Sequence, residues 1–219
     1  MLICIEGVDC SGKETQSKLL AQALIKEGKS VARFSFPFYE TATGKIIANQ
    51  YLGKHEQSLF NEGAVNVDPT VASLYYAADR KYNLPIIQKA LKEHDVVILD
   101  RYVYSNMAHQ GCKLSRVERE KFFNFIESLE FKLLSLPVPD LTIFLYLPLE
   151  LTSKLKRERE ELPDGHEQDE TYLARAEETY LSLAQKFDFK QINCSQSGNI
   201  LSKEDIAEKV LALVKTKLK

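Results

Sequence analysis

The sequence has little net charge, few cysteines and no long apolar segment. Its 29 basic and 31 acidic residues leave a formal net charge of −2, so the chain has no overall attraction to nucleic acid or to an anionic membrane. The four cysteines are not spaced as metal ligands, and no segment resembles a signal peptide or a membrane span. These absences predict a cytoplasmic protein with reduced thiols and without a nucleic-acid or membrane partner.

The sequence also lacks linkers and repeats. No stretch rich in proline, glycine and serine divides the 219 residues, and no low-complexity tract interrupts them. Hydrophobic residues make up 44% and charged residues 27% of the chain, which are ordinary values for a protein that builds a core. We therefore expect one domain that spans residues 1–219.

Short apolar runs alternate with amphipathic stretches along the chain. The runs predict strands near 2–5, 30–36, 96–99, 141–147 and 189–192. Helical periodicity predicts helices at about 15–28, 42–52, 70–93, 116–135, 149–161, 168–186 and 203–218. Strands that alternate with helices form a parallel sheet with helices on both faces. The prediction is a three-layer α/β fold with about five parallel strands, whose ligands bind at the carboxyl ends of the strands.

A glycine-rich segment follows the first predicted strand. Gly7, Gly12 and Lys13 match the Gly-x-x-x-x-Gly-Lys pattern of a phosphate-binding loop, and a predicted helix follows. Backbone N–H groups of such a loop point at a phosphate, and the lysine binds the outer phosphates. Because strand, loop and helix occur in the required order, we favour a nucleotide-binding loop over a chance surface turn. The predicted nucleotide-binding residues are Gly7, Val8, Asp9, Cys10, Ser11, Gly12, Lys13, Glu14 and Thr15.

The position after the loop lysine departs from the pattern, which requires Ser or Thr as an Mg²⁺ ligand. Glu14 occupies this position, and the hydroxyl comes one residue later, at Thr15. A carboxylate can bind Mg²⁺ or one of its water molecules, but it also adds negative charge beside the phosphates. Asp100, at the end of the third predicted strand, is a further candidate metal ligand, although an acid there can also cap a helix.

Three other groupings are candidates for a second binding site. Arg101 beside Asp100 predicts a phosphate clamp, with a plain surface ion pair as the alternative. Tyr76 and Arg80 lie on one helical face and can stack on a base and bind its edge; alternatively, Tyr76 is a core residue and Arg80 is solvated. Asn106 and His109 can face one pocket, although a lone histidine is more often structural.

A basic stretch near residue 154 is followed by a break that contains proline and glycine. This order is typical of a mobile lid, here at about 154–168, whose arginines neutralise the charge of a phosphate in transfer. The alternative is a solvated helix stabilised by pairs such as Lys154–Glu158. On a regular helix Arg157 and Arg159 diverge by about 200°, so one can point inward without the other.

Together these segments resemble the thymidylate kinase family over nearly the whole chain. The segments that carry the resemblance are 6–16, Phe36-Pro37, 74–80, 100–102 with Ser105, and 139–143. The resemblance implies a P-loop NTPase-type fold, transfer of the γ-phosphate of ATP to dTMP with Mg²⁺, and a homodimer. Cys10 in the loop, with Arg157 and Arg159 in the lid, resembles the bacterial members, which carry lid arginines in place of a loop arginine.

The resemblance also implies roles for single residues. Lys13 and the loop amides hold the ATP phosphates, Arg101 binds the dTMP phosphate, and Asp9 meets the sugar 3′-hydroxyl. Tyr76 stacks on thymine, Arg80 and Asn106 address its polar edge, and His109 lies against the sugar, where relatives often have Tyr or Phe. The implied catalytic residues are Lys13, Arg101, Arg157 and Arg159. The implied dTMP-binding residues are Asp9, Phe36, Tyr39, Tyr76, Arg80, Arg101, Asn106 and His109, and the candidate metal ligands are Glu14, Thr15 and Asp100.

Two further positions depart from the family pattern. Tyr39 stands where many relatives have an arginine near the monophosphate, and Tyr146 replaces a common acid near the end of the fourth strand. Alternatives therefore stay open: a kinase for another acceptor, such as dUMP or a deoxynucleoside, or an inactive P-loop nucleotide-binding protein. A guanine-specific switch is disfavoured because the sequence has no Asn-Lys-x-Asp run.

Overall fold

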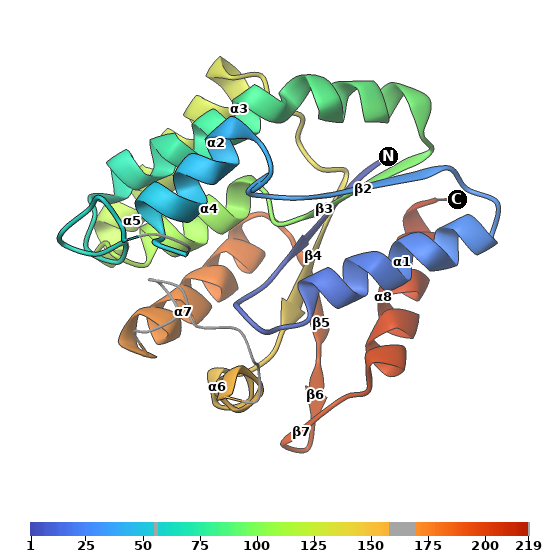
Figure 1. Cartoon of the computed structure of the whole chain (residues 1–219). Helices are drawn as coiled ribbons and strands as arrows, with labels where there is room; N and C mark the ends of the chain where they lie inside the picture. The colour runs from blue at the N-terminus through green and yellow to red at the C-terminus, as the bar shows by residue number, and fades with distance from the viewer. Residues whose placement is uncertain (55–56, 158–169, 219) are drawn as a thin grey trace.

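The computed structural model describes residues 1–54, 57–157 and 170–218, and its centre is a parallel β-sheet (Figure 1). The strands are β1 (Leu2–Glu6), β2 (Val31–Ser35), β3 (Val96–Asp100), β4 (Leu141–Tyr146) and β5 (Lys190–Asn193). They are hydrogen-bonded in the order β2-β3-β1-β4-β5, and every neighbouring pair is parallel. The five apolar runs therefore form the strands that they predict, and the α/β fold is confirmed.

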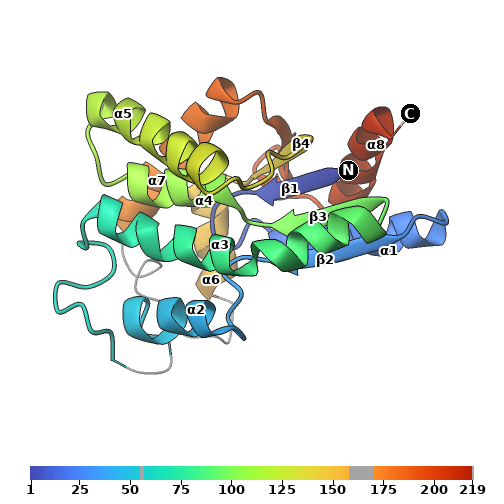
Figure 2. The ribbon, with the colours of Figure 1, turned by 90° about the horizontal axis from the view of Figure 1, so that it is seen from above.

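Helices connect the strands and cover both faces of the sheet (Figures 1 and 2). Their bounds are α1 (Lys13–Lys26), α2 (Ala42–Lys45), η1 (Ile46–Tyr51), α3 (Pro69–Glu93), α4 (Val103–Gly111), α5 (Arg116–Ile126), η2 (Glu127–Leu133), α6 (Leu149–Arg157), α7 (Glu170–Lys186) and α8 (Lys203–Lys217). Core residues of α1 and α8 pack on one face, and core residues of α3, α4, α5 and α7 pack on the other. The result is a three-layer arrangement of helices, sheet and helices.

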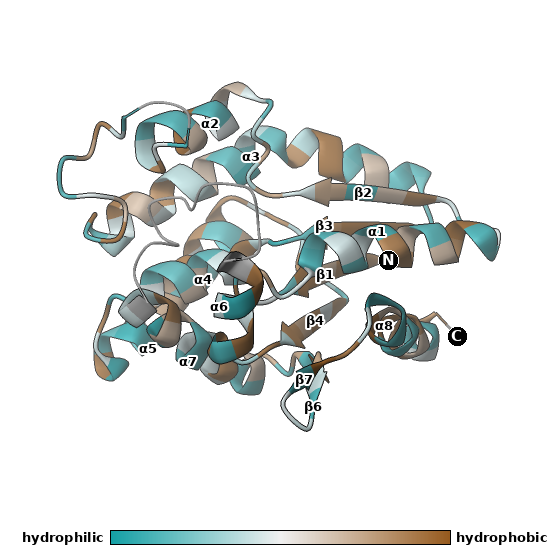
Figure 3. Ribbon diagram, turned by 60° about the horizontal axis from the view of Figure 1, so that its bottom comes forward, coloured by the Kyte–Doolittle hydropathy of each residue, from teal (hydrophilic) through white to brown (hydrophobic). Residues whose placement is uncertain are grey.

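The side chains of β1 show why the central strands are continuously apolar. Ile3 and Ile5 pack with α1 and α8, whereas Leu2 and Cys4 pack with the helices of the opposite layer. Successive side chains of a strand point to opposite faces, so a strand that is covered on both faces needs an apolar residue at nearly every position. Figure 3 shows the central strands as hydrophobic along most of their length.

Some elements differ from the predicted ones. Helix α4 is absent from the periodicity-based prediction, and its residues are buried nearly all round, so it has no polar face that would reveal a helical period. The predicted helices at 42–52 and 116–135 are each an α-helix that continues as a π-helical segment, η1 or η2. A short hairpin of β6 (Ser195–Gln196) and β7 (Asn199–Ile200) was not predicted. Among the described residues, no helix is long and apolar enough to cross a bilayer.

The register of the central strands brings two chain segments to one edge of the sheet. Ile5 of β1 lies opposite Asp100 of β3, so the loop after β1 and the turn after β3 leave the sheet side by side. The carboxyl ends of parallel strands are the usual place for ligands in this kind of fold.

Candidate active site

The loop between β1 and α1 curls around the N-terminus of α1. Cys10 and Gly12 have positive φ angles of 61° and 86°, and Gly12 is the N-cap of α1. A β-carbon on Gly7 would lie 2.5 Å from Ser11 Oγ and 2.7 Å from the backbone oxygen of Leu145, so only glycine fits there. This curled backbone at a helix N-terminus is an anion-binding geometry, and the buried Ser11 hydroxyl has no hydrogen-bond partner among the described residues.

Lys13 lies inside this loop rather than in solvent. It is 5% exposed, and its Nζ donates a hydrogen bond to the backbone oxygen of Val8 at 2.6 Å. Burial, helped by the nearby charge of Arg101, lowers the pKa of Lys13 to about 8. A buried ammonium is costly unless it is paired, and a phosphate oxygen would be a stronger acceptor for it than a neutral carbonyl.

The three candidate metal ligands, Glu14, Thr15 and Asp100, differ in how deeply they are buried and in what they contact. Glu14 is exposed on α1 and forms an ion pair with Lys18 at 2.5 Å, which lowers the pKa of Glu14. Its role as a metal ligand therefore stays a prediction that would require the carboxylate to leave Lys18. Thr15 is half-buried in the first turn of α1.

Asp100 is the candidate ligand that fits a cation best. It is 4% exposed, burial raises its pKa, and no described residue donates a hydrogen bond to its carboxylate. The described residues contain no group of three or more His, Cys, Asp or Glu side chains that could hold a metal alone. A single buried carboxylate such as Asp100 is compatible with Mg²⁺, which is usually bound by one or two carboxylates together with phosphates and water.

Arg101 follows directly after β3 and connects the two sides of the site. Its φ is +64°, and its guanidinium Nη2 pairs with Asp9 Oδ1 of the phosphate-binding loop. Burial opposes its positive charge, but Asp9 and other nearby acids raise the pKa of Arg101 well above its usual range. The predicted phosphate clamp is thus a fixed, always charged guanidinium beside the loop, and it still has N–H groups that Asp9 does not use.

His109 lies next to Arg101 and is held by α7. Its Nε2 is 3.4 Å from Arg101 Nη1, and its Nδ1 is 3.1 Å from the hydroxyl of Tyr172. The rings of His109 and Tyr172 stack with centroids 6.0 Å apart, and Tyr180 contacts His109 edge-on at 5.8 Å. Sequence reasoning missed both tyrosines, although their spacing of eight places them on the same face of α7.

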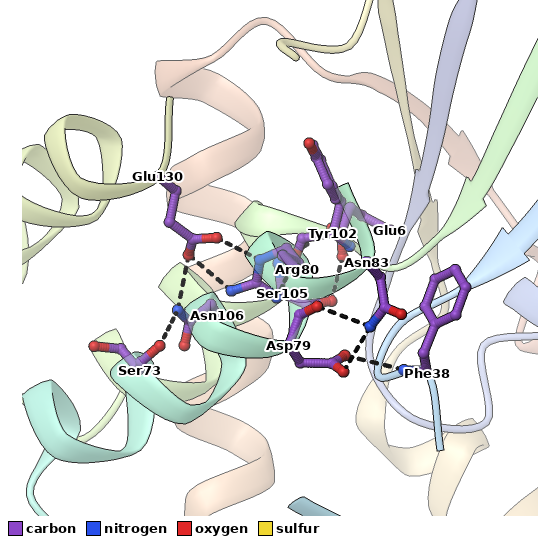
Figure 4. A network of polar contacts seen from close by, with 10 residues as sticks. All are labelled: Glu6, Phe38, Ser73, Asp79, Arg80, Asn83, Tyr102, Ser105, Asn106 and Glu130. Carbon is purple, nitrogen blue, oxygen red and sulfur yellow. Dashed lines mark hydrogen bonds and ion pairs between the residues drawn. The ribbon is translucent and has the colours of Figure 1, made fainter. Parts of the chain in front are cut away.

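Arg80, Asn106 and Glu130 form a buried network behind this region (Figure 4). Arg80 is 3% and Glu130 0% exposed, and Arg80 pairs with both carboxylate oxygens through Nε and Nη2. Asn106 donates to the same carboxylate at 3.0 Å and to the backbone oxygen of Ser73 at 3.2 Å. The alternative of Arg80 as a solvated helix charge is therefore wrong. Glu130 was not predicted, because its segment of charged residues resembles a solvated helix.

Three aromatic residues that were predicted to bind dTMP differ in exposure: Phe36 is buried, Tyr76 is half-buried and Tyr39 is exposed. Tyr76 packs edge-on against Tyr51 at 5.8 Å, at the border of a small apolar cluster. Phe36 is 3% exposed and packs on Tyr102, so the structure gives it a core position. Tyr39 is 36% exposed, and Lys54 Nζ lies 4.5 Å above its ring. The roles of these three residues in binding dTMP stay predictions.

Two further acids position the site and were not predicted. Asp79 accepts hydrogen bonds from Phe38 N at 3.0 Å and from Thr43 Oγ1 at 2.6 Å, and so attaches the segment after β2 to α3. Glu6 is buried at the end of β1 and binds the start of α4 and Tyr180 of α7. Both acids hold the chain segments from which the candidate ligand-binding side chains project.

The lid arginines are not placed. Arg157 is the last residue of α6, but its side chain lies outside the described part of the structure. Arg159 and residues 158–168 of the predicted lid also lie outside the described residues. Their contribution to the site is therefore still a prediction.

Comparisons with known proteins agree on one family. A family model described as thymidylate kinase matches residues 5–206. A thymidylate kinase of Mycobacterium tuberculosis is 34% identical over 190 residues, which cover 84% of this chain and 86% of that protein. A probable thymidylate kinase of Methanocaldococcus jannaschii is 32% identical over 215 residues, covering 98% and 96%. The solved structure of the Candida albicans thymidylate kinase aligns with a TM-score of 0.73 at 27% identity and covers 99% of this chain and 91% of that chain.

Proposed function

The chain belongs to the thymidylate kinase family, and from this premise we propose that it transfers the γ-phosphate of ATP to dTMP at the sheet edge described above. The observation that carries the proposal is the pairing of β1 with β3, with Ile5 opposite Asp100. It brings the Lys13 loop, which suits the donor phosphates, beside Arg101, which suits the acceptor phosphate. Transfer between two phosphorylated substrates requires two such cationic groups next to one another.

The residues of the site act by binding and charge neutralisation. Lys13 and the loop N–H groups hold the outer phosphates of ATP, and Arg101 holds the acceptor monophosphate in line with them. A bound Mg²⁺ would neutralise part of the phosphate charge, and Asp100 is the residue that we propose for holding it or its water. Asp9, which pairs with Arg101, would accept a hydrogen bond from the acceptor sugar. Arg157 and Arg159 of the lid would complete the positive charge around the transferred group.

The activity is tested by measuring ADP release with ATP, Mg²⁺ and a panel of acceptors. The panel contains dTMP, dUMP, dCMP and thymidine. We expect turnover with dTMP, and a higher kcat/KM for dTMP than for the others. Turnover of dUMP in preference to dTMP would overturn the acceptor assignment, and no turnover with any acceptor would show an inactive nucleotide-binding protein instead.

The metal role of Asp100 can be separated from that of Glu14. Asp100→Asn is expected to raise the Mg²⁺ concentration for half-maximal activity by about 10-fold or more, because it removes the buried charge nearest the proposed cation. Glu14→Gln is expected to change it less than about 2-fold, because Glu14 is exposed and paired with Lys18. Titration of activity with MgCl₂ at fixed ATP gives both values. A larger effect of Glu14→Gln would place the carboxylate at the metal and reverse the assignment.

The proposal includes a homodimer formed through α3. Four of its exposed apolar side chains, Val71, Leu74, Tyr82 and Ile86, lie within about 120° of one another on a regular helix, on the side opposite the core-facing Leu84 and Ile87. A continuous exposed apolar face is typical of an interaction surface, and a two-fold axis lets the same face bind itself in a second copy. Helix α3 lies at the outer edge of the molecule in Figure 1.

Charge on this face is expected to prevent dimerisation. Leu74→Glu combined with Tyr82→Glu would bury two like-charged pairs in the dimer, which costs far more than the interface could recover. Sedimentation velocity at micromolar concentration should show a dimer for the unmodified chain and a monomer for the double variant. The matched control is Gln88→Glu, which adds an exposed charge to α3 just outside this face of about 120° and should stay dimeric. A monomeric unmodified chain would contradict the proposal.

We also propose a cytoplasmic location. None of the four cysteines forms a disulfide in the structure, and cysteines without disulfide bonds are the usual state in reducing compartments. Fractionation of the producing cells, with the protein detected by antibody, would test this location.

A further inference from the structure

The buried carboxylate of Glu130 connects the two side chains that are predicted to meet the acceptor base. In the π-helical segment η2, Glu130 is 0% exposed, and its Oε1 accepts from Arg80 Nη2 at 2.7 Å and from Asn106 Nδ2 at 3.0 Å (Figure 4). Arg80 Nε donates to the other oxygen. Single turns of π-helix frequently occur at functional sites. Arg80 and Asn106 thus meet at the same carboxylate oxygen and have their orientations fixed by it.

The partners of Asn106 determine which way its amide points. Nδ2 donates to the backbone oxygen of Ser73 at 3.2 Å and to Glu130 at 3.0 Å. Both partners only accept hydrogen bonds, so the reversed amide would place Oδ1 against two acceptors. Oδ1 is therefore turned away from them, and it is buried without a donor among the described residues. A buried oxygen without a donor is unfavourable, and a ligand N–H would remove this cost.

Arg80 carries hydrogen-bond donors, whereas Asn106 Oδ1 is an acceptor. Glu130 uses the Nε hydrogen and one Nη2 hydrogen of Arg80. Within the described residues, Nη1 has one long contact, 3.5 Å, to the backbone oxygen of Tyr102. Because a guanidinium has five N–H groups and no acceptor, Arg80 can only present donors to a ligand. Among the described residues, the pair therefore has a weakly used donor on Arg80 and an unused acceptor on Asn106.

We propose that Glu130 is a positioning residue that sets this donor–acceptor pattern and so makes the acceptor site select 4-oxo over 4-amino pyrimidine monophosphates; the inference rests on the proposed function. Thymine and uracil present O4, an acceptor, beside N3–H, a donor, whereas cytosine presents an amino donor beside an acceptor nitrogen. The edge of thymine and uracil matches the donor of Arg80 and the acceptor of Asn106. The edge of cytosine would set its amino donor against Arg80 and its acceptor nitrogen against Asn106 Oδ1, which leaves buried polar groups unpaired.

The first test replaces Glu130 with glutamine and measures acceptor preference. Glutamine keeps the shape of the side chain, but an amide NH₂ replaces one carboxylate oxygen. This NH₂ either faces the guanidinium of Arg80 or donates to Asn106, in which case the Asn106 amide turns over. We expect the ratio of kcat/KM for dTMP to that for dCMP to fall about 10-fold or more, with a higher KM for dTMP and an unchanged KM for ATP. Glu127→Gln is the matched control, since Glu127 is on the same segment and pairs with Lys132 on the surface; it should leave the ratio and both KM values unchanged.

A double-mutant cycle shows whether Glu130 acts through Asn106. In an Asn106→Ala background, Glu130→Gln should lower the dTMP-to-dCMP ratio by a smaller factor than in the unmodified chain. An equal factor in both backgrounds, or an unchanged ratio in a folded Glu130→Gln protein, would overturn the inference. Turnover of dTMP by the unmodified chain would still stand in that case, so failure of the inference is distinguishable from failure of the proposed function.

The second test needs no variant and holds even if Glu130→Gln does not fold. Against the unmodified chain, dTMP methylated at N3 lacks the donor for Asn106 Oδ1. We expect its kcat/KM to be about 100-fold or more below that of dTMP, and dCMP to be rejected to a similar or greater extent. Comparable kcat/KM for dTMP and either analogue would show that the network does not present this pattern to the base.

Discussion

Replacing Lys13 with methionine is expected to lower kcat/KM for ATP by about 10²–10³-fold, which is typical for loss of one preorganised charged donor at a phosphoryl-transfer site. Lys13 is 5% exposed inside the phosphate-binding loop, so its charge acts on the phosphates with little screening by water. Methionine keeps the length and the packing of the side chain. The same change should not lower stability, because burial lowers the pKa of Lys13 to about 8, which means that folding disfavours its charged form.

Steady-state ADP release and thermal unfolding of the same samples check this prediction. We expect activity to fall while the melting temperature stays unchanged or rises, as is common when a strained functional residue is removed. Lys18→Met is the control, because Lys18 is an exposed lysine on the same helix whose described partner is Glu14; its kcat/KM should stay within about 3-fold. An unchanged kcat/KM for Lys13→Met would contradict the proposed role of the loop in binding phosphate.

The sheet and the loop could be predicted from sequence because they depend on local patterns. A strand covered on both faces needs a continuous apolar run, and the runs that become β1 and β3 have this form, with every residue buried. The sequence pattern identifies Gly7 and Gly12 as turn positions, although the close approach of Leu145 to Gly7 is visible only in the structure. The position of Arg101 beside the loop then followed from the rule that ligands gather at the carboxyl ends of parallel strands.

The supporting residues could not be predicted because their roles depend on contacts that are distant in the chain. Glu130 binds Arg80, which is 50 positions away, and Tyr172 binds His109 across 63 positions. Local sequence around Glu130 contains charges at helical spacing and is typical of a solvated face. Glu130 points inward because η2 contacts α3 and α4 through Arg80 and Asn106. The periodicity of the sequence does not predict these contacts.

Glu14 is a different case, because two local sequence patterns assign its side chain to different partners. Glu14 and Lys18 are four residues apart, the spacing at which opposite charges on a helix pair, and the structure contains that pair. The sequence interpretation placed Glu14 at the metal because the loop pattern requires a ligand at this position. The pattern defines where a ligand would be needed, but the direction of the side chain depends on what else it can bind.

The buried side chain of Glu6 holds together several segments around the site. Its Oε1 accepts from the backbone N–H groups of Tyr102 at 2.9 Å and Ser105 at 3.1 Å. Its Oε2 accepts from the hydroxyls of Ser105 at 2.6 Å and Tyr180 at 3.1 Å. One buried carboxylate therefore connects β1, the turn after Arg101 and α7.

Glu6→Ala is expected to destabilise the fold by about 3–5 kcal/mol, because two buried N–H groups and two hydroxyls lose their acceptor. This corresponds to a fall in melting temperature of about 10 °C for a chain of this size, measurable by circular dichroism together with urea unfolding. Glu6→Gln should cost less, since the two hydroxyls can rotate and accept from the new amide. Glu120→Ala, which removes an exposed partner of Lys186, should cost about 1 kcal/mol or less. If Glu6→Ala unfolded no more easily than Glu120→Ala, the hydrogen bonds of Glu6 would not stabilise the fold. The connection that they make between β1, the Arg101 turn and α7 could then not explain why Arg101 stays beside the phosphate-binding loop.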